Sequence, residues 1–129
     1  MALSIALDTN RYVDFCRDDP VAVDVIVKAQ RIVLPFVVLA ELRGGFRCGT
    51  QRGANEQTLS RFLQQSQVEV AYADEATTHF YAIIFAELQS TGTPIPANDI
   101  WIAALTIQHD LVLFSRDKYF DHVARIARL

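Results

Sequence analysis

Four acidic side chains stand at or beside strongly apolar segments that lie far apart along the chain. They are Asp8, Glu41, Asp99 and Asp117, and Glu41 directly follows the apolar run 36–40. A buried carboxylate costs free energy unless it is paired, hydrogen-bonded or bound to a cation. Four such groups in apolar settings therefore predict that they meet at one site and share a polyvalent cation. This chemistry indicates an enzyme.

Each acid also has an ordinary structural explanation. Asp8 and Asp99 stand where helices are expected to begin, and a carboxylate there can cap the helix by accepting a backbone hydrogen bond. Glu41 could reach water from the edge of a buried stripe or pair with a nearby arginine. Asp117 could be a turn residue, and Asp121 competes with it as the fourth acid. The hypothesis of a shared site therefore depends on the four acids together.

Oxygen ligands without a cysteine or histidine pair favour Mg²⁺ or Mn²⁺ over zinc. Such an ion lowers the pKa of a bound water, polarises a phosphoryl oxygen and stabilises a leaving group, which suits phosphodiester hydrolysis. The polar neighbours Thr9, Asn10 and Ser115 are expected to orient a carboxylate or a water. No G-x-S-x-G, G-x-G-x-x-G or P-loop sequence occurs, so the signatures of triad hydrolysis and nucleotide binding are absent.

The elements that must position these acids alternate between short apolar strands and helices. Expected strands cover residues 3–7, 31–34, 68–72 and 111–114. Expected helices cover residues 10–17, 21–29, 35–45, 51–65, 74–91 and 97–108. Strands that are apolar on both faces predict an α/β fold, with a central parallel sheet between helices on both sides.

The expected sheet places the acids together. Ligands of such sheets bind beyond the carboxyl ends of the strands, and Asp8 and Asp117 follow the first and last predicted strands. Glu41 and Asp99 would come from helices that border the same crevice. The inward face of the helix at residues 74–91 is predicted from its apolar spacing to contain Ala76, Phe80, Ile83, Ile84 and Leu88.

The composition is that of one globular domain over residues 1–129, with 51% hydrophobic and 21% charged residues. The longest apolar run, residues 32–40, is too short to span a bilayer, and the N-terminal residues lack the pattern of a signal peptide. Cys16 and Cys48 have no C-x-x-C spacing, so both are expected to be free thiols. A cytoplasmic protein is predicted.

The net charge of −3 conceals one basic stretch. Between Leu42 and Asn55 there is no acid, but Arg43, Arg47 and Arg52 are present. If the chain binds a polyanion, this stretch is the first candidate contact surface.

The order and spacing of the acidic motifs resemble those of PIN-domain ribonucleases, and among them the VapC-like toxins of toxin–antitoxin pairs. The motifs are Leu7-Asp8-Thr9-Asn10, Val38-Leu39-Ala40-Glu41-Leu42, Asn98-Asp99-Ile100-Trp101-Ile102-Ala103-Ala104 and Leu113-Phe114-Ser115-Arg116-Asp117. The likeness covers nearly the whole chain. Ser115 stands where the family more often has threonine, which keeps the hydroxyl group.

The resemblance implies an endoribonuclease that uses Mg²⁺ or Mn²⁺, forms a homodimer and is inhibited by a cognate antitoxin inserting a segment near the pocket. Asp8, Glu41 and Asp99 would hold the ion directly or through water, and Asp117 would complete the cluster or take a second ion. RNA phosphates would contact Arg43, Arg47, Arg52, Arg116 and Lys118, unless these are solvated or locally ion-paired. The alternatives are a housekeeping RNA-processing nuclease, a receiver-like phosphoacceptor and a non-catalytic RNA-binding module.

Overall fold

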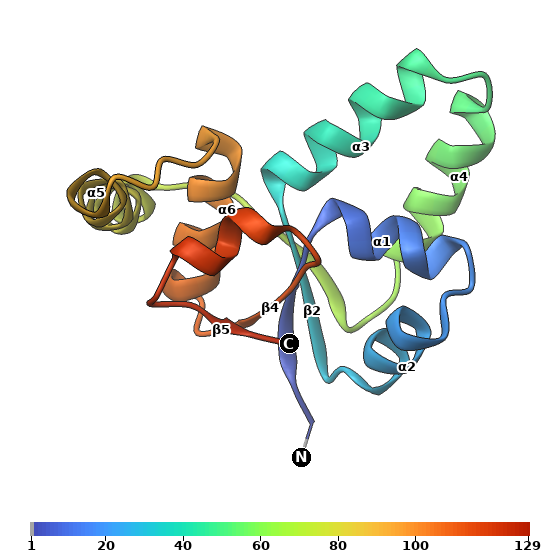
Figure 1. The fold of residues 1–129 in the computed structure, drawn as a ribbon. Helices are drawn as coiled ribbons and strands as arrows, with labels where there is room; N and C mark the ends of the chain where they lie inside the picture. The colour runs from blue at the N-terminus through green and yellow to red at the C-terminus, as the bar shows by residue number, and fades with distance from the viewer. Residues whose placement is uncertain (1) are drawn as a thin grey trace.

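A computed structural model describes residues 2–129 and contains a five-stranded sheet in which all neighbouring strands are parallel (Figure 1). The strands are β1 (Ser4–Leu7), β2 (Arg31–Pro35), β3 (Val68–Ala71), β4 (Val112–Phe114) and β5 (Ala127–Arg128). They lie in the order β3-β2-β1-β4-β5. The predicted parallel sheet is confirmed, whereas β5 was not predicted because two residues carry no periodic pattern.

Helices cover both faces of this sheet. They are α1 (Thr9–Cys16), α2 (Pro20–Lys28), α3 (Phe36–Cys48), α4 (Arg52–Leu63), α5 (Glu75–Thr91), α6 (Ala97–Gln108) and the 3₁₀ helix η1 (Lys118–His122). Figure 1 shows α1 and α2 on one side of the sheet and α5 and α6 on the other. The α/β/α arrangement is therefore as predicted, and α6 has the bounds expected from the sequence.

The carboxyl ends of β1 and β4 lie side by side at the centre of the sheet. Leu7 of β1 pairs with Phe114 of β4, and the amide of Asp8 donates to the carbonyl of Phe114 at 3.2 Å. The chain leaves β1 toward β2 on one side, and β4 occupies the other side. This is the topological switch point, where parallel sheets open a crevice for ligands.

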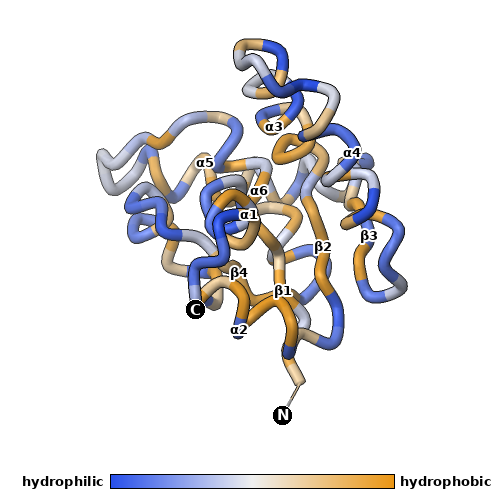
Figure 2. The backbone as a smooth tube through the Cα atoms, turned by 90° about the vertical axis from the view of Figure 1, so that its right-hand side faces the viewer, coloured by the Kyte–Doolittle hydropathy of each residue, from blue (hydrophilic) through white to orange (hydrophobic). Residues whose placement is uncertain are grey.

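Apolar side chains fill the space between the sheet and the helices. Ile5, Ala6 and Leu7 of β1 are completely buried, as a central parallel strand requires. Figure 2 shows this apolar character along β1, β2 and β4. None of the helices in residues 2–129 has both the length and the apolar character needed to cross a bilayer.

The buried face of α5 differs from the predicted one. Ala76 and Ile83 were expected to face inward, but both are exposed. Ile84 and Leu88 are buried as predicted, and Thr77 is the one buried residue of α5 that was not predicted. The Thr77 hydroxyl donates to Gln108 of α6 at 2.6 Å, and this polar contact fixes a rotation of the helix that apolar spacing alone did not reveal.

Candidate functional site

Asp8 is held rigidly where β1 ends. Its side chain accepts a hydrogen bond at 2.8 Å from the Thr9 amide, which caps α1, and one at 2.6 Å from the Ser115 hydroxyl beyond β4. Asn10 Nδ2 lies 3.3 Å from Ser115 Oγ and donates to it. Asp8 is only 4% exposed, so these donors compensate part of the cost of burying its charge. Asp8 therefore caps α1 and also lies among the acids of the predicted site.

The loop that carries Asp117 is tied to the same carboxylate. The Asp117 amide donates to Ser115 Oγ at 3.0 Å, and the Arg116 amide donates to Asn10 Oδ1 at 3.1 Å. The Asp117 side chain accepts from the Tyr119 amide at 2.9 Å and caps η1. The polar groups predicted from the sequence at positions 10 and 115 therefore connect α1 to the loop after β4.

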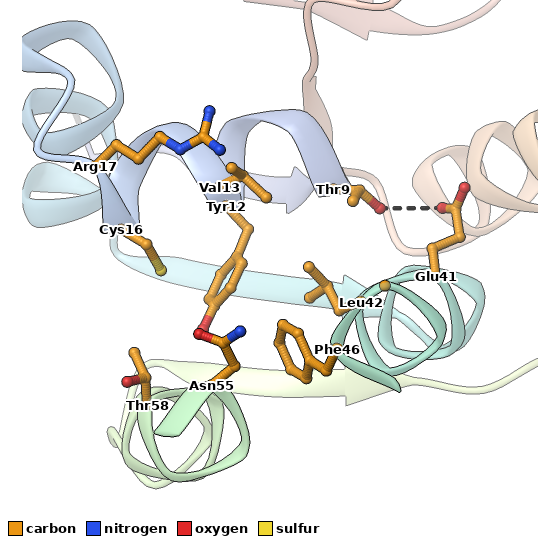
Figure 3. A pocket seen from close by; sticks show the side chains of 11 residues that line it. Thr9, Tyr12, Val13, Cys16, Arg17, Glu41, Leu42, Phe46, Asn55 and Thr58 are labelled. Atoms are coloured by element: carbon orange, nitrogen blue, oxygen red, sulfur yellow. Dashed lines mark hydrogen bonds between the residues drawn. The ribbon is translucent and has the colours of Figure 1, made fainter. Parts of the chain in front are cut away.

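Glu41 reaches the site from α3 by one contact. The Thr9 hydroxyl donates to Glu41 Oε1 at 3.0 Å, across the gap between α1 and α3 that Figure 3 shows. Val37 and Val38 of the same helix are buried, as predicted, but Glu41 itself is exposed. Glu41 therefore lies at the exposed edge of the buried stripe of α3, next to the buried Leu42.

Asp99 lies in the first turn of α6 and is 7% exposed. Pro96 is the N-cap of this helix and provides no side-chain hydrogen bond, so helix capping does not explain Asp99. Burial raises the pKa of Asp99 to about 7, with further contributions from the negative charges of Asp117, Asp8 and Glu41. The four predicted acids are therefore close enough to repel one another.

Asp117, and not Asp121, lies close enough to the other three acids to act on them. Besides acting on Asp99, Asp117 adds to the rise in the pKa of Asp8 and Glu41, which in both cases is caused mainly by loss of water around the carboxylate. Asp121 instead forms an ion pair with Arg128. Sequence position alone could not separate these two acids, since both follow β4 closely.

The oxygen donors brought together here fit a hard divalent cation. Repulsion among the carboxylates, seen in the raised pKa of Asp99, is the penalty that such a cation would remove. No three His, Cys, Asp or Glu side chains within residues 2–129 are already arranged as a group that could hold a metal ion.

Two polar contacts at the site escaped the sequence analysis. Arg128 in β5 donates through Nη2 to the carbonyl oxygens of Ser115 and Asp117, both at 3.2 Å. Asp14 of α1 accepts from Arg116 Nε at 2.8 Å and from its Nη2 at 2.9 Å. No local sequence signal marks either contact, because the partners are brought together only by the fold.

The predicted RNA-contacting cations divide into two groups. Arg43 pairs with Glu56 at 3.3 Å, and Arg116 is the partner of Asp14, so both are locally ion-paired. Across residues 2–129, no carboxylate oxygen lies within 4.0 Å of the charged groups of Arg47, Arg52 or Lys118.

A cavity of about 530 Å³ opens between α1, α3 and α4 and reaches Thr9 and Glu41 (Figure 3). Apolar side chains of Leu42 and Phe46 line one part of it. The cavity therefore gives a ligand access to the exposed edge of the acidic site.

Comparison with known proteins identifies relatives of similar size and fold. Ribonuclease VapC4 of Mycobacterium tuberculosis is 30% identical over 81 residues, which are 63% of this chain and 62% of that protein. The solved structure of VapBC2 from Rickettsia felis, bound to a promoter DNA fragment, matches with a TM-score of 0.83 at 24% identity. It covers 98% of each chain.

A further solved structure, VapBC-5 of the VapBC family of toxin–antitoxin systems from Mycobacterium tuberculosis, matches with a TM-score of 0.72 at 22% identity. It covers 98% of this chain and 99% of that one. At these identities the two structures establish the fold. The family model of the PIN domain matches residues 5–126, which include all four acids, and the chain therefore belongs to the PIN domain family.

Proposed function

We propose that this protein is an endoribonuclease that requires Mg²⁺ or Mn²⁺ and hydrolyses RNA phosphodiester bonds. The observation that carries the proposal is the convergence of four carboxylates at one place, where burial, and then the negative charges of Asp117, Asp8 and Glu41, raise the pKa of Asp99 to about 7. The matching ribonuclease VapC4 supports RNA as the substrate. Because the match spans 62% of that relative, the activity of the whole relative is transferred here as a proposal.

In this proposal Asp8, Glu41 and Asp99 hold the ion directly or through water, and Asp117 completes the cluster or takes a second ion. The bound ion supplies an activated water and stabilises negative charge on the phosphoryl group. The chain's own contribution is orientation. Ser115 and the Thr9 amide fix the carboxylate of Asp8, while the Thr9 hydroxyl directs Glu41 toward it.

The substrate backbone is proposed to contact cations that are free of local acids. Arg47, Arg52 and Lys118 fit this role better than Arg43 and Arg116, whose guanidinium groups are already bonded to carboxylates. Neutralising each phosphate releases bound counterions, so RNA affinity should fall steeply as salt rises.

The proposed role is that of a cytoplasmic toxin, active as a homodimer and inhibited by a cognate antitoxin. The solved VapBC relatives support a partner of this kind. The cavity beside Glu41 is the proposed entry for an inhibitory segment, because it leads directly to the acidic site. A small reading frame next to this gene, whose product binds the protein and stops cleavage, would support the toxin role over a housekeeping nuclease.

The function is tested by incubating the protein with single-stranded RNA in EDTA, and then with added Mg²⁺ or Mn²⁺. Internal cleavage should appear only with the metal. Glu41→Gln is the matched control, because Glu41 is exposed and its neutral form should fold normally. RNA binding without metal-dependent cleavage would instead identify a non-catalytic RNA-binding module, and equal cleavage by Glu41→Gln would contradict the proposed site.

A further inference from the structure

The side chain of Arg128 extends from β5 to the loop that follows β4. Its Nη2 group donates to the carbonyl oxygens of Ser115 and Asp117, and its Nη1 group pairs with Asp121. One guanidinium thus contacts both ends of the three-residue loop 115–117, which places Asp117 at the start of η1. The side chain is 24% exposed, so much of it is enclosed by the fold.

Strand β5 places this guanidinium. Arg128 is paired with Leu113 of β4, and the Leu129 amide donates to the Leu113 carbonyl at 3.0 Å. The guanidinium also lies 6.0 Å from the centre of the Phe120 ring. Backbone pairing and side-chain packing therefore hold Arg128 where its planar guanidinium group can donate hydrogen bonds to the loop 115–117.

The contacts use the shape of arginine and not only its charge. A guanidinium presents several donors in a fixed plane, whereas a lysine ammonium is a compact charge on a flexible stem. Lysine could retain the ion pair with Asp121 but could not hold both carbonyls and this acid in the same geometry. A substitution of Arg128 by lysine therefore separates charge from positioning.

We propose that Arg128 is a positioning residue that fixes the Ser115–Asp117 loop and thereby strengthens divalent-cation binding by the acidic site. Two effects of Arg128 oppose each other at this site. Its positive charge repels a cation, while its hydrogen bonds hold the loop so that Asp117 remains beside Asp99. The second effect is the larger one in this proposal, because an unrestrained loop must lose conformational freedom each time the ion binds.

This inference uses the cation site of the proposed function, but its test needs no RNA. Mn²⁺ binding is measured by electron paramagnetic resonance of the free ion, for the wild type, Arg128→Lys and Arg128→Met. Arg125→Lys is the matched control, since Arg125 precedes β5 and pairs with Glu87 outside the site. Thermal unfolding and circular dichroism establish that each variant is folded at the temperature of the titration.

Both Arg128 variants should need about tenfold more Mn²⁺ for half-saturation, a size typical of lost support around a metal site. Arg125→Lys should bind as the wild type does. If Arg128→Lys binds normally and Arg128→Met binds more tightly, charge dominates and the proposal is wrong. It is also wrong if both variants lose thermal stability but keep wild-type Mn²⁺ affinity, or if the wild type binds no Mn²⁺.

RNA cleavage, measured in parallel at saturating Mn²⁺, separates this inference from the proposed function. Weaker Mn²⁺ binding by the Arg128 variants supports the positioning role even if the wild type cleaves no RNA. Conversely, the wild type could cleave RNA only with metal while Arg128→Lys keeps the wild-type Mn²⁺ affinity. That outcome would support the nuclease function and contradict the positioning role of Arg128.

Discussion

The acidic site has two halves that are held in different ways. Asp8 and Asp117 follow neighbouring strands and share the Ser115 hydroxyl, which bonds the side chain of one and the amide of the other. Glu41 and Asp99 come from helices on which fewer groups fix the carboxylate. Glu41 accepts one hydrogen bond from Thr9, and Asp99 faces the like charge of Asp117.

This contrast shows that one half of the site is fixed by hydrogen bonds, whereas the other half has few of them. The strand half is fixed by hydrogen bonds between parts of the chain that are over 100 residues apart, such as Asn10 and Ser115. The helix half keeps its charges crowded and only lightly restrained. We therefore expect the loss of a supporting hydrogen bond in the strand half to reduce both stability and activity, and the loss of one in the helix half to reduce mainly activity.

The largest effect is expected from Asp8→Asn. Cleavage should fall by about 100-fold or more, since even supporting groups around a metal contribute about 10- to 100-fold. The thermal midpoint in EDTA should stay equal or rise, because asparagine can still cap α1 while a buried negative charge is removed. Initial cleavage rates and thermal unfolding test this. Undiminished cleavage would remove Asp8 from the mechanism.

Ser115→Ala should reduce both properties. The substitution removes a buried donor to Asp8 and leaves the partly buried Asp117 amide without its acceptor, which costs about 1–3 kcal/mol of unfolding free energy. Cleavage should fall by roughly 10- to 100-fold. Ser115→Thr keeps the hydroxyl and is the matched control. Denaturant unfolding and cleavage rates that are unchanged in Ser115→Ala would show that the strand half does not need this bond.

The stability of the protein should depend on pH because of Asp99, which belongs to the helix half of the site. Burial and neighbouring charges raise the pKa of Asp99 to about 7 in the folded protein, well above its unfolded value. Between these values the folded state binds more protons, so the free energy of unfolding must fall as pH rises from about 4 to about 7. Thermal unfolding in EDTA across this range should show the decrease.

Asp99→Asn should flatten this pH dependence, and saturating Mg²⁺ should also flatten it by stabilising the charged form at high pH. Asp110→Asn is a control, because Asp110 is exposed and lies after the end of α6. An unchanged slope in Asp99→Asn would mean that other groups cause the pH effect.

The sequence predicted most of the scaffold because each main strand is a short apolar run and the acids follow its ends. It also predicted Asn10 and Ser115 as polar supports, since both adjoin an acidic motif. It could not choose between Asp117 and Asp121, because only the turn into η1 decides which of them faces Asp99. The contact of Arg128 with Asp117 was equally hidden, since it depends on a two-residue strand.

The charge of Glu41 illustrates a different error. Its neighbours on α3 are apolar, which predicted burial, but Glu41 lies on the exposed face of this helix, next to the buried Leu42. Burial depends on what lies opposite a helix face, and the pattern of the helix alone does not contain that information.

Thr9→Val should have the smallest effect and is the most direct test of the contrast. It removes the hydroxyl that orients Glu41 but keeps the Thr9 amide that caps α1. Loss of this hydrogen bond should raise the activation free energy of cleavage by about 1 kcal/mol, which corresponds to roughly fivefold slower cleavage. The unfolding free energy should change by less than about 0.5 kcal/mol, because Glu41 is exposed and loses no buried partner.

Thr9→Ser restores the hydroxyl and should restore the rate, which separates the hydrogen bond from the packing of the methyl group. Cleavage and denaturant unfolding are measured for both variants beside Ser115→Ala. If Thr9→Val destabilises the protein as much as Ser115→Ala does, the two halves are equally rigid and the contrast is wrong. If only the cleavage rate changes, Glu41 belongs to a part of the site that the fold leaves adjustable and that a bound cation must complete.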